Sequence, residues 1–90
     1  MIPTYNNLIK FESEIQNSYS LSSYLLANKH YLDHLLNIFN QCELNISDLN
    51  NFNNLNIIFR IVRHIISIAS NELLELLLTD QYYFFIFGAW

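Results

Sequence analysis

The chain has 90 residues and a formal net charge of −4, a size that suits one small domain or a piece of a larger protein. Leu, Ile, Val and Phe supply 35 of the residues, far above the roughly one-fifth below which chains stay disordered. Charged residues make up 13%, against about 25% in typical domains, and thirteen Asn residues fill many polar positions. The four basic residues are spread as Lys10, Lys29, Arg60 and Arg63, so we expect no nucleic-acid partner.

Three residue types that occur once each exclude further classes. One Gly and one Pro are too few for the many tight turns of a β-sandwich, barrel or propeller. One Cys excludes an internal disulfide and a four-cysteine zinc site. The most apolar stretch, residues 76–90, is interrupted by Asp80 and is shorter than the roughly 20 residues of a membrane-spanning helix, so we expect no membrane partner.

The first third of the chain predicts two short helices. Leu8, Phe11 and Ile15 have helical spacing, which the run Ser18-Tyr19-Ser20 breaks. Ser20 can cap a second short helix that extends through Leu26.

Residues 29–43 have the clearest helical pattern. Leu32, Leu35, Leu36 and Phe39 recur at spacings of three and four, so they lie on one face of a helix. Polar residues take the opposite face, and the sequence therefore predicts an amphipathic helix here.

A polar loop is predicted over residues 45–54, where Ser47 or Asp48 can cap the next helix. Residues 55–69 then form a second long helix, because the polar positions recur every three or four residues rather than at every second one. This spacing outweighs the strand preference of its many Ile residues. Its apolar face is wide enough to contact more than one neighbour and consists of Ile58, Ile61, Val62, Ile65, Ile66, Ile68 and Ala69.

The last part of the chain predicts a further short helix, which Ser70 or Asn71 can cap. Five Leu residues of this helix are expected to be buried nearly all round: Leu73, Leu74, Leu76, Leu77 and Leu78. Residues 82–87 then form either a final helix that ends at Gly88 or a buried strand.

Residues that carry chemistry are few. His30 and His34 share a helix face at a spacing that can hold a metal, but a zinc site needs a third ligand. Cys42 is turned away from them and is predicted to be a small buried apolar residue, and His64 is predicted to be exposed beside Arg60.

The two close carboxylate pairs are Glu12 with Glu14, which lie on different faces of a helix, and Glu72 with Glu75, which suit the dipole of a helix N-terminus. No nucleophile motif or glycine-rich phosphate loop is present. We therefore expect no enzyme, no cofactor and no metal site.

Protein contact is the remaining candidate role. Two arginines on one helix stripe can hold an acidic partner segment, and the aromatic end of the chain can contact another element or a second copy of the chain. The candidate protein-binding residues are Arg60, Arg63, Tyr82, Tyr83, Phe85 and Trp90.

Three stretches of residues 31–90 form an ordered set. The first reads YLDHLLNIFNQCE at residues 31–43, the second covers residues 55–68, and the third reads LLELLLTDQ at 73–81 followed by IFGA at 86–89. In this order they resemble the central domain of regulatory subunit 3 of protein phosphatase 4, the SMEK family. The residues on the family pattern are Tyr31, Leu35, Leu36, Phe39, Cys42, Glu43, Arg63, Glu75, Asp80 and Gly88. Phe85 stands where the family usually has an acidic residue, and the loop at 44–54 is longer than the family pattern leads us to expect.

The fold prediction is all-α: an armadillo- or HEAT-like stack of about five helices in a single domain or fragment, residues 1–90. The resemblance implies a non-catalytic scaffold that helps to bring the phosphatase to its substrates. It implies the phosphatase 4 catalytic subunit and a second regulatory subunit as partners, and the nucleus and cytoplasm as location. Two alternatives stay open: a helical adaptor unrelated to phosphatases, and a helical protein that lies on a membrane through its aromatic end. The sparse basic residues count against the latter, since interfacial helices favour Lys and Arg.

Overall fold

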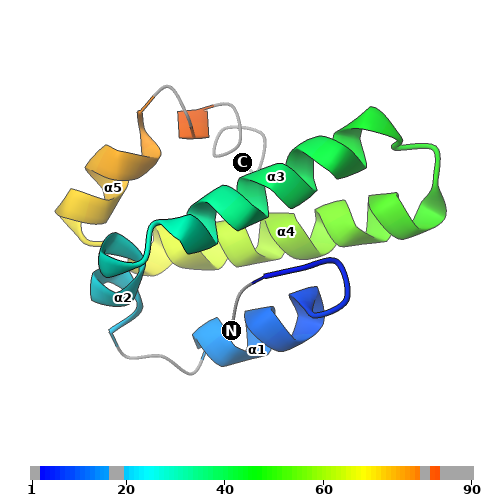
Figure 1. Cartoon of the computed structure of the whole chain (residues 1–90). Coiled ribbons are helices and arrows are strands. Elements are labelled where there is room, and N and C mark those ends of the chain that lie inside the picture. The colour runs from blue at the N-terminus through cyan, green and yellow to red at the C-terminus, as the bar shows by residue number, and fades with distance from the viewer. Residues whose placement is uncertain (1–2, 17–19, 80–81, 84–90) are drawn as a thin grey trace.

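The computed structural model describes residues 3–16, 20–79 and 82–83, and these residues form five α-helices and no strand (Figure 1). The helices are α1 (Leu8–Gln16), α2 (Leu21–Ala27), α3 (His30–Leu44), α4 (Leu49–Ile68) and α5 (Asn71–Leu77). The all-α prediction is confirmed for this part of the chain. The armadillo or HEAT type of stacking stays a prediction, and so does the assignment of residues 1–90 to one domain.

Helices α3 and α4 form an antiparallel hairpin whose turn lies at residues 45–48 (Figure 1). Each helix buries one apolar stripe of helical period against the other, which is why the two longest helices lie side by side. The buried residues of the pair are Tyr31, Leu32, Leu35, Ile38, Phe39 and Cys42 on α3, and Leu55, Ile58, Ile61, Val62 and Ile65 on α4.

Helix α4 is the centre of the structure. It packs against α3, α1 and α2, and α2 in turn packs against α5. The predicted contact of its wide apolar face with more than one neighbour is confirmed. At its C-terminal end, Ser22 of α2 donates its hydroxyl to the carbonyl oxygen of Ile68 (3.2 Å) and accepts the backbone N–H of Ser70 (3.0 Å).

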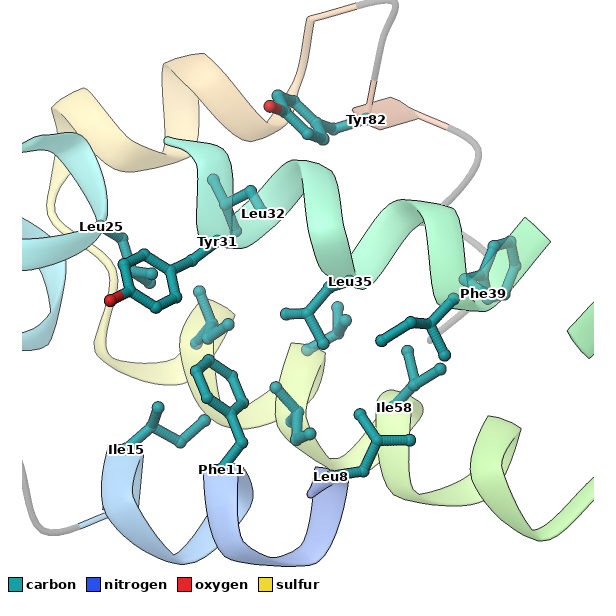
Figure 2. Packing of buried hydrophobic residues seen from close by; sticks show 14 of the residues in the cluster. Leu8, Phe11, Ile15, Leu25, Tyr31, Leu32, Leu35, Phe39, Ile58 and Tyr82 are labelled. Atoms are coloured by element: carbon teal, nitrogen blue, oxygen red, sulfur yellow. The ribbon is translucent and has the colours of Figure 1, made fainter. Parts of the chain in front are cut away.

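The core lies between α1, α3 and α4, with Leu25 of α2 at its edge (Figure 2). The rings of Phe11 and Tyr31 are stacked with their centroids 6.3 Å apart. Leu35 and Ile58 are fully buried. Because burying one such side chain contributes about 1.5–3 kcal/mol, this cluster is the main source of stability.

The start of α4 differs from the prediction. The helix begins at Leu49, six residues before the expected start, and the polar loop is limited to residues 45–48. The carboxylate of Asp48 caps the helix by accepting the N–H of Asn50 (2.8 Å), and the Asn51 amide donates to the carbonyl oxygen of Asn45 (3.0 Å). Residues 49–54 of the predicted loop therefore form the first turn and a half of α4.

The burial of α5 also differs from the prediction. Leu73 and Leu77 are buried, Leu74 and Leu76 are half-buried, and Leu78 is exposed. Only the face of α5 toward its neighbours is covered. Leu78 lies outside this face, after the last helical residue. The expectation that all five Leu residues are buried is wrong.

Four described residues lie beyond α5: Leu78, Thr79, Tyr82 and Tyr83. The backbone N–H groups of Tyr82 and Tyr83 both donate to the carbonyl oxygen of Thr79 at 3.0 Å, which holds these two residues close to the end of α5. The predicted final helix or strand at 82–87 and its end at Gly88 lie, from residue 84 on, outside the described residues.

Candidate protein-interaction surfaces

Arg60 forms an ion pair within the chain. Its Nε and Nη2 atoms donate to Glu12 Oε2 (2.9 Å) and Oε1 (3.1 Å), which joins α4 to α1. The pair is bidentate, and the hydrogen bond to Glu12 is the main reason why the pKa of Arg60 is raised. Since 54% of the Arg60 side chain is exposed but only 13% of Glu12, the arginine covers the carboxylate from the solvent side.

Arg63 lies one turn further along α4 and is exposed. His64 beside it is half-buried, not exposed as predicted, and its carbonyl oxygen accepts the Ser67 hydroxyl (2.7 Å). Arg60 therefore holds two helices together, and contact of Arg63 with a partner protein stays a prediction.

Tyr82 is a core residue, which argues against its prediction as a protein-binding residue. Only 3% of it is exposed, and its hydroxyl donates to Asp33 Oδ1 of α3 at 2.6 Å. Burial, followed by this hydrogen bond, raises the pKa of Tyr82. Figure 2 shows its ring on the opposite side of α3 from α1.

The rest of the aromatic end is only partly described. Tyr83 is 43% exposed, as a contact residue requires. Phe85 and Trp90 lie outside the described residues, so their role in partner binding stays a prediction.

The histidines of α3 lie at its exposed N-terminal end. The His30 ring lies against Tyr31 with the centroids 4.4 Å apart, and the rings of His30 and His34 meet edge to face at 6.3 Å. Within the described residues, no three His, Cys, Asp or Glu side chains are grouped as metal ligands would be.

Cys42 is fully buried near the other end of α3, which confirms its prediction as a small apolar core residue. Burial is the main cause that raises the pKa of its thiol, and a hydrogen bond with the Tyr5 side chain acts in the opposite direction. Burial and a raised pKa both disfavour this thiol as a nucleophile.

A tyrosine pair between α2 and α3 was not predicted. The Tyr24 hydroxyl donates to the Tyr31 hydroxyl at 2.8 Å, and the ring centroids are 5.3 Å apart. This hydrogen bond is the main cause that raises the pKa of Tyr24. Sequence gives no signal for the pair, because the two residues belong to different helices with a bend between them.

The α3–α4 turn carries an exposed apolar surface that sequence reasoning also missed. The four large apolar residues between positions 44 and 52 are each between 48% and 88% exposed: Leu44, Ile46, Leu49 and Phe52. Their signal is visible in the sequence as apolar residues in a stretch rich in Asn, but the expectation of a polar loop hid it. We name this set the hairpin tip.

These features define a helical protein in which several polar side chains connect helices and whose exposed groups suit contact with another protein. In the described part of the chain, each helix is too short or too polar to span a bilayer.

Residues 6–90 match the family model described as phosphatase 4 regulatory subunit 3, and the chain belongs to that family. The match covers the α1 region as well as residues 31–90, so it extends beyond the stretch that carried the resemblance. No curated protein and no solved structure gives a significant match.

Proposed function

We propose that this chain is a non-catalytic scaffold domain of a phosphatase 4 regulatory subunit, which helps to bring the phosphatase to its substrates by protein–protein contact. The observation that carries the proposal is the family match over residues 6–90. The partners proposed are the phosphatase 4 catalytic subunit and a second regulatory subunit. The proposed location is the nucleus and the cytoplasm, which imaging of a fluorescent fusion tests.

The contacts of the polar side chains support a structural role. Glu12 accepts two hydrogen bonds from Arg60, and this ion pair holds α1 against α4. Asp33 accepts the hydroxyl of Tyr82. These two acidic side chains pair with side chains of other segments and so stabilise the arrangement of the helices. Such contacts suit a scaffold, which must present a fixed surface to its partners.

Affinity capture tests the proposal. A tagged longer family protein that contains this domain is expected to capture the phosphatase 4 catalytic subunit and the second regulatory subunit. The 90-residue chain alone is expected to capture them weakly or not at all, because helical-repeat scaffolds bind through surfaces spread over several repeats.

The outcomes separate the alternatives. If the longer protein captures neither subunit, the phosphatase proposal is wrong and a general helical adaptor is favoured. If residues 1–90 alone capture the catalytic subunit strongly, the role stands but the main binding surface lies on this domain. A phosphopeptide hydrolysis assay on the purified chain is expected to show no release of phosphate.

A further inference from the structure

The hairpin tip is the most concentrated exposed apolar surface of the described residues. Leu44 ends α3, Ile46 lies in the turn, and Leu49 and Phe52 lie three residues apart at the start of α4, on one face of that helix. Figure 1 shows this turn at the free end of the α3–α4 hairpin, away from α2 and α5. Side chains of this size left largely in water amount to roughly a few hundred Å², the size at which an apolar patch usually marks a contact site.

The charge around the tip has one sign. From position 30 to position 59 the chain has three acidic residues, Asp33, Glu43 and Asp48, and no Lys or Arg. Glu43 and Asp48 are exposed directly beside the apolar residues. The next basic residue along α4 is Arg60, about 12 Å beyond Phe52 at the rise of an α-helix, and it is paired with Glu12.

The helix ends reinforce this charge. The C-terminal end of α3 has a partial negative charge, and no basic residue lies in its last turn. The opposite partial charge at the start of α4 is met by the capping carboxylate of Asp48. A cationic group beside Leu44 is therefore favoured by Glu43 and by the last carbonyl groups of α3 together.

We propose that the hairpin tip binds a short segment of a partner protein that has apolar residues flanked by Lys or Arg. This assignment rests on the proposed scaffold function and deepens it, because it gives the domain a surface and the chemistry of what it holds. A second copy of the chain is disfavoured as the occupant, since it brings the same acidic residues and a net charge of −4. An anionic lipid surface is disfavoured for the same reason.

Calorimetric titration of the 90-residue chain with a synthetic amphipathic peptide of Leu and Lys tests the assignment. Leu44→Ser with Leu49→Ser leaves the charge unchanged and is expected to weaken binding by about tenfold or more, because it removes the apolar contact. Glu43→Gln with Asp48→Asn leaves the apolar residues in place and keeps an N-cap residue. It is expected to weaken binding and to reduce its dependence on salt.

The matched control is Ile9→Ser with Leu78→Ser, which removes two exposed apolar residues elsewhere and is expected to leave the affinity unchanged. Circular dichroism checks that each variant keeps its helices. Backbone amide shifts in NMR spectra are expected to locate the peptide at residues 43–52.

Three results would overturn the assignment. One is equal peptide affinity in the wild type and both hairpin variants, and another is equal affinity for a peptide in which Glu replaces Lys. The third is self-association or binding to anionic vesicles that Leu44→Ser with Leu49→Ser abolishes, which would make a second copy or a membrane the occupant. No phosphatase takes part in the titration, so its failure is distinct from failure of the capture experiment.

Discussion

The hydroxyl of Tyr82 lies 2.6 Å from the carboxylate of Asp33, although the two residues are 49 positions apart. The tyrosine follows α5 and the aspartate lies in the first turn of α3, so this hydrogen bond fixes the chain beyond α5 against the hairpin. The ring adds apolar contact, since it belongs to the buried cluster. One residue of the aromatic end is thereby part of the hydrophobic core.

Tyr82→Phe is expected to lower the free energy of unfolding by about 1–2 kcal/mol, because a hydrogen bond to a charged acceptor is lost while the ring remains. Urea unfolding of Tyr82→Phe, Asp33→Ala and the double variant measures the coupling between the two side chains. Additive effects of the two single changes would show that the hydrogen bond does not contribute to stability.

The same pair makes stability depend on alkaline pH. The pKa of Tyr82 is raised above 10.0, its value in the unfolded chain, so its contribution is fully present below that pH. As pH rises further, the unfolded state releases the proton first and stability falls, by at most about 1.4 kcal/mol per pH unit for one group. Tyr82→Phe is expected to reduce this slope without abolishing it, because the pKa values of Tyr5 and Tyr24 are also raised. An unchanged slope in urea unfolding between pH 9 and 11 would contradict this assignment.

The three N-caps of α2, α4 and α5 are expected to differ in their contribution to stability. Asp48 and Ser70 accept backbone N–H groups through their side chains, at 2.8 Å and 3.3 Å, whereas Ser20 makes no such bond. Asp48→Ala and Ser70→Ala are expected to cost about 1 kcal/mol each, and Ser20→Ala close to nothing. Thermal unfolding compares them, and a Ser20→Ala variant as unstable as Ser70→Ala would be the contrary result.

The strength of each local sequence pattern decided which parts of the fold could be predicted. The inner faces of α3 and of the second part of α4 repeat at three and four residues, and both were predicted as helices. The first turns of α4 were missed because Asn is a weak helix former and because Leu49 and Phe52 are exposed, so no buried stripe marks the helix there. Its start depends on the Asp48 cap, which the sequence offers only as one of two candidates.

The surface was harder to predict because it depends on pairs far apart in the chain. Arg60 was expected on a solvent stripe, but Glu12 reaches it from a position 48 residues earlier. Tyr82 was a candidate for binding a partner protein, but it hydrogen-bonds Asp33 and is buried in the core. The composition shows that charged side chains are scarce. Only the packing of the helices decides which polar side chains meet.

The ion pair between Arg60 and Glu12 is expected to contribute modestly, at most about 1 kcal/mol, because the arginine is half exposed and solvent screens it. The coupling in an Arg60→Gln and Glu12→Gln cycle is expected to shrink in about 1 M salt, where the screening length is about 3 Å. Arg60→Lys keeps the charge but loses the bidentate geometry, and should recover only part of the coupling. A coupling of zero in low salt would mean that the pair does not hold α1 in place.

The aromatic end is expected to cause self-association of the 90-residue chain, through residues other than Tyr82. Tyr83 and Leu78 are both exposed beside it, and the sequence after Asp80 has no charged side chain. In a helical stack an exposed apolar end favours a covering partner, and a second copy is available at high concentration.

Phe85→Asp with Trp90→Ser introduces the acid usual in the family at position 85 and removes the largest ring. Light scattering at micromolar concentrations is expected to show a smaller average mass for this variant than for the wild type. Leu44→Ser with Leu49→Ser is the control, since it removes exposed apolar residues of the α3–α4 turn instead and should leave the mass unchanged. If the wild type and the Phe85→Asp, Trp90→Ser variant are equally monomeric, the aromatic residues after Tyr83 do not drive association and the prediction is wrong.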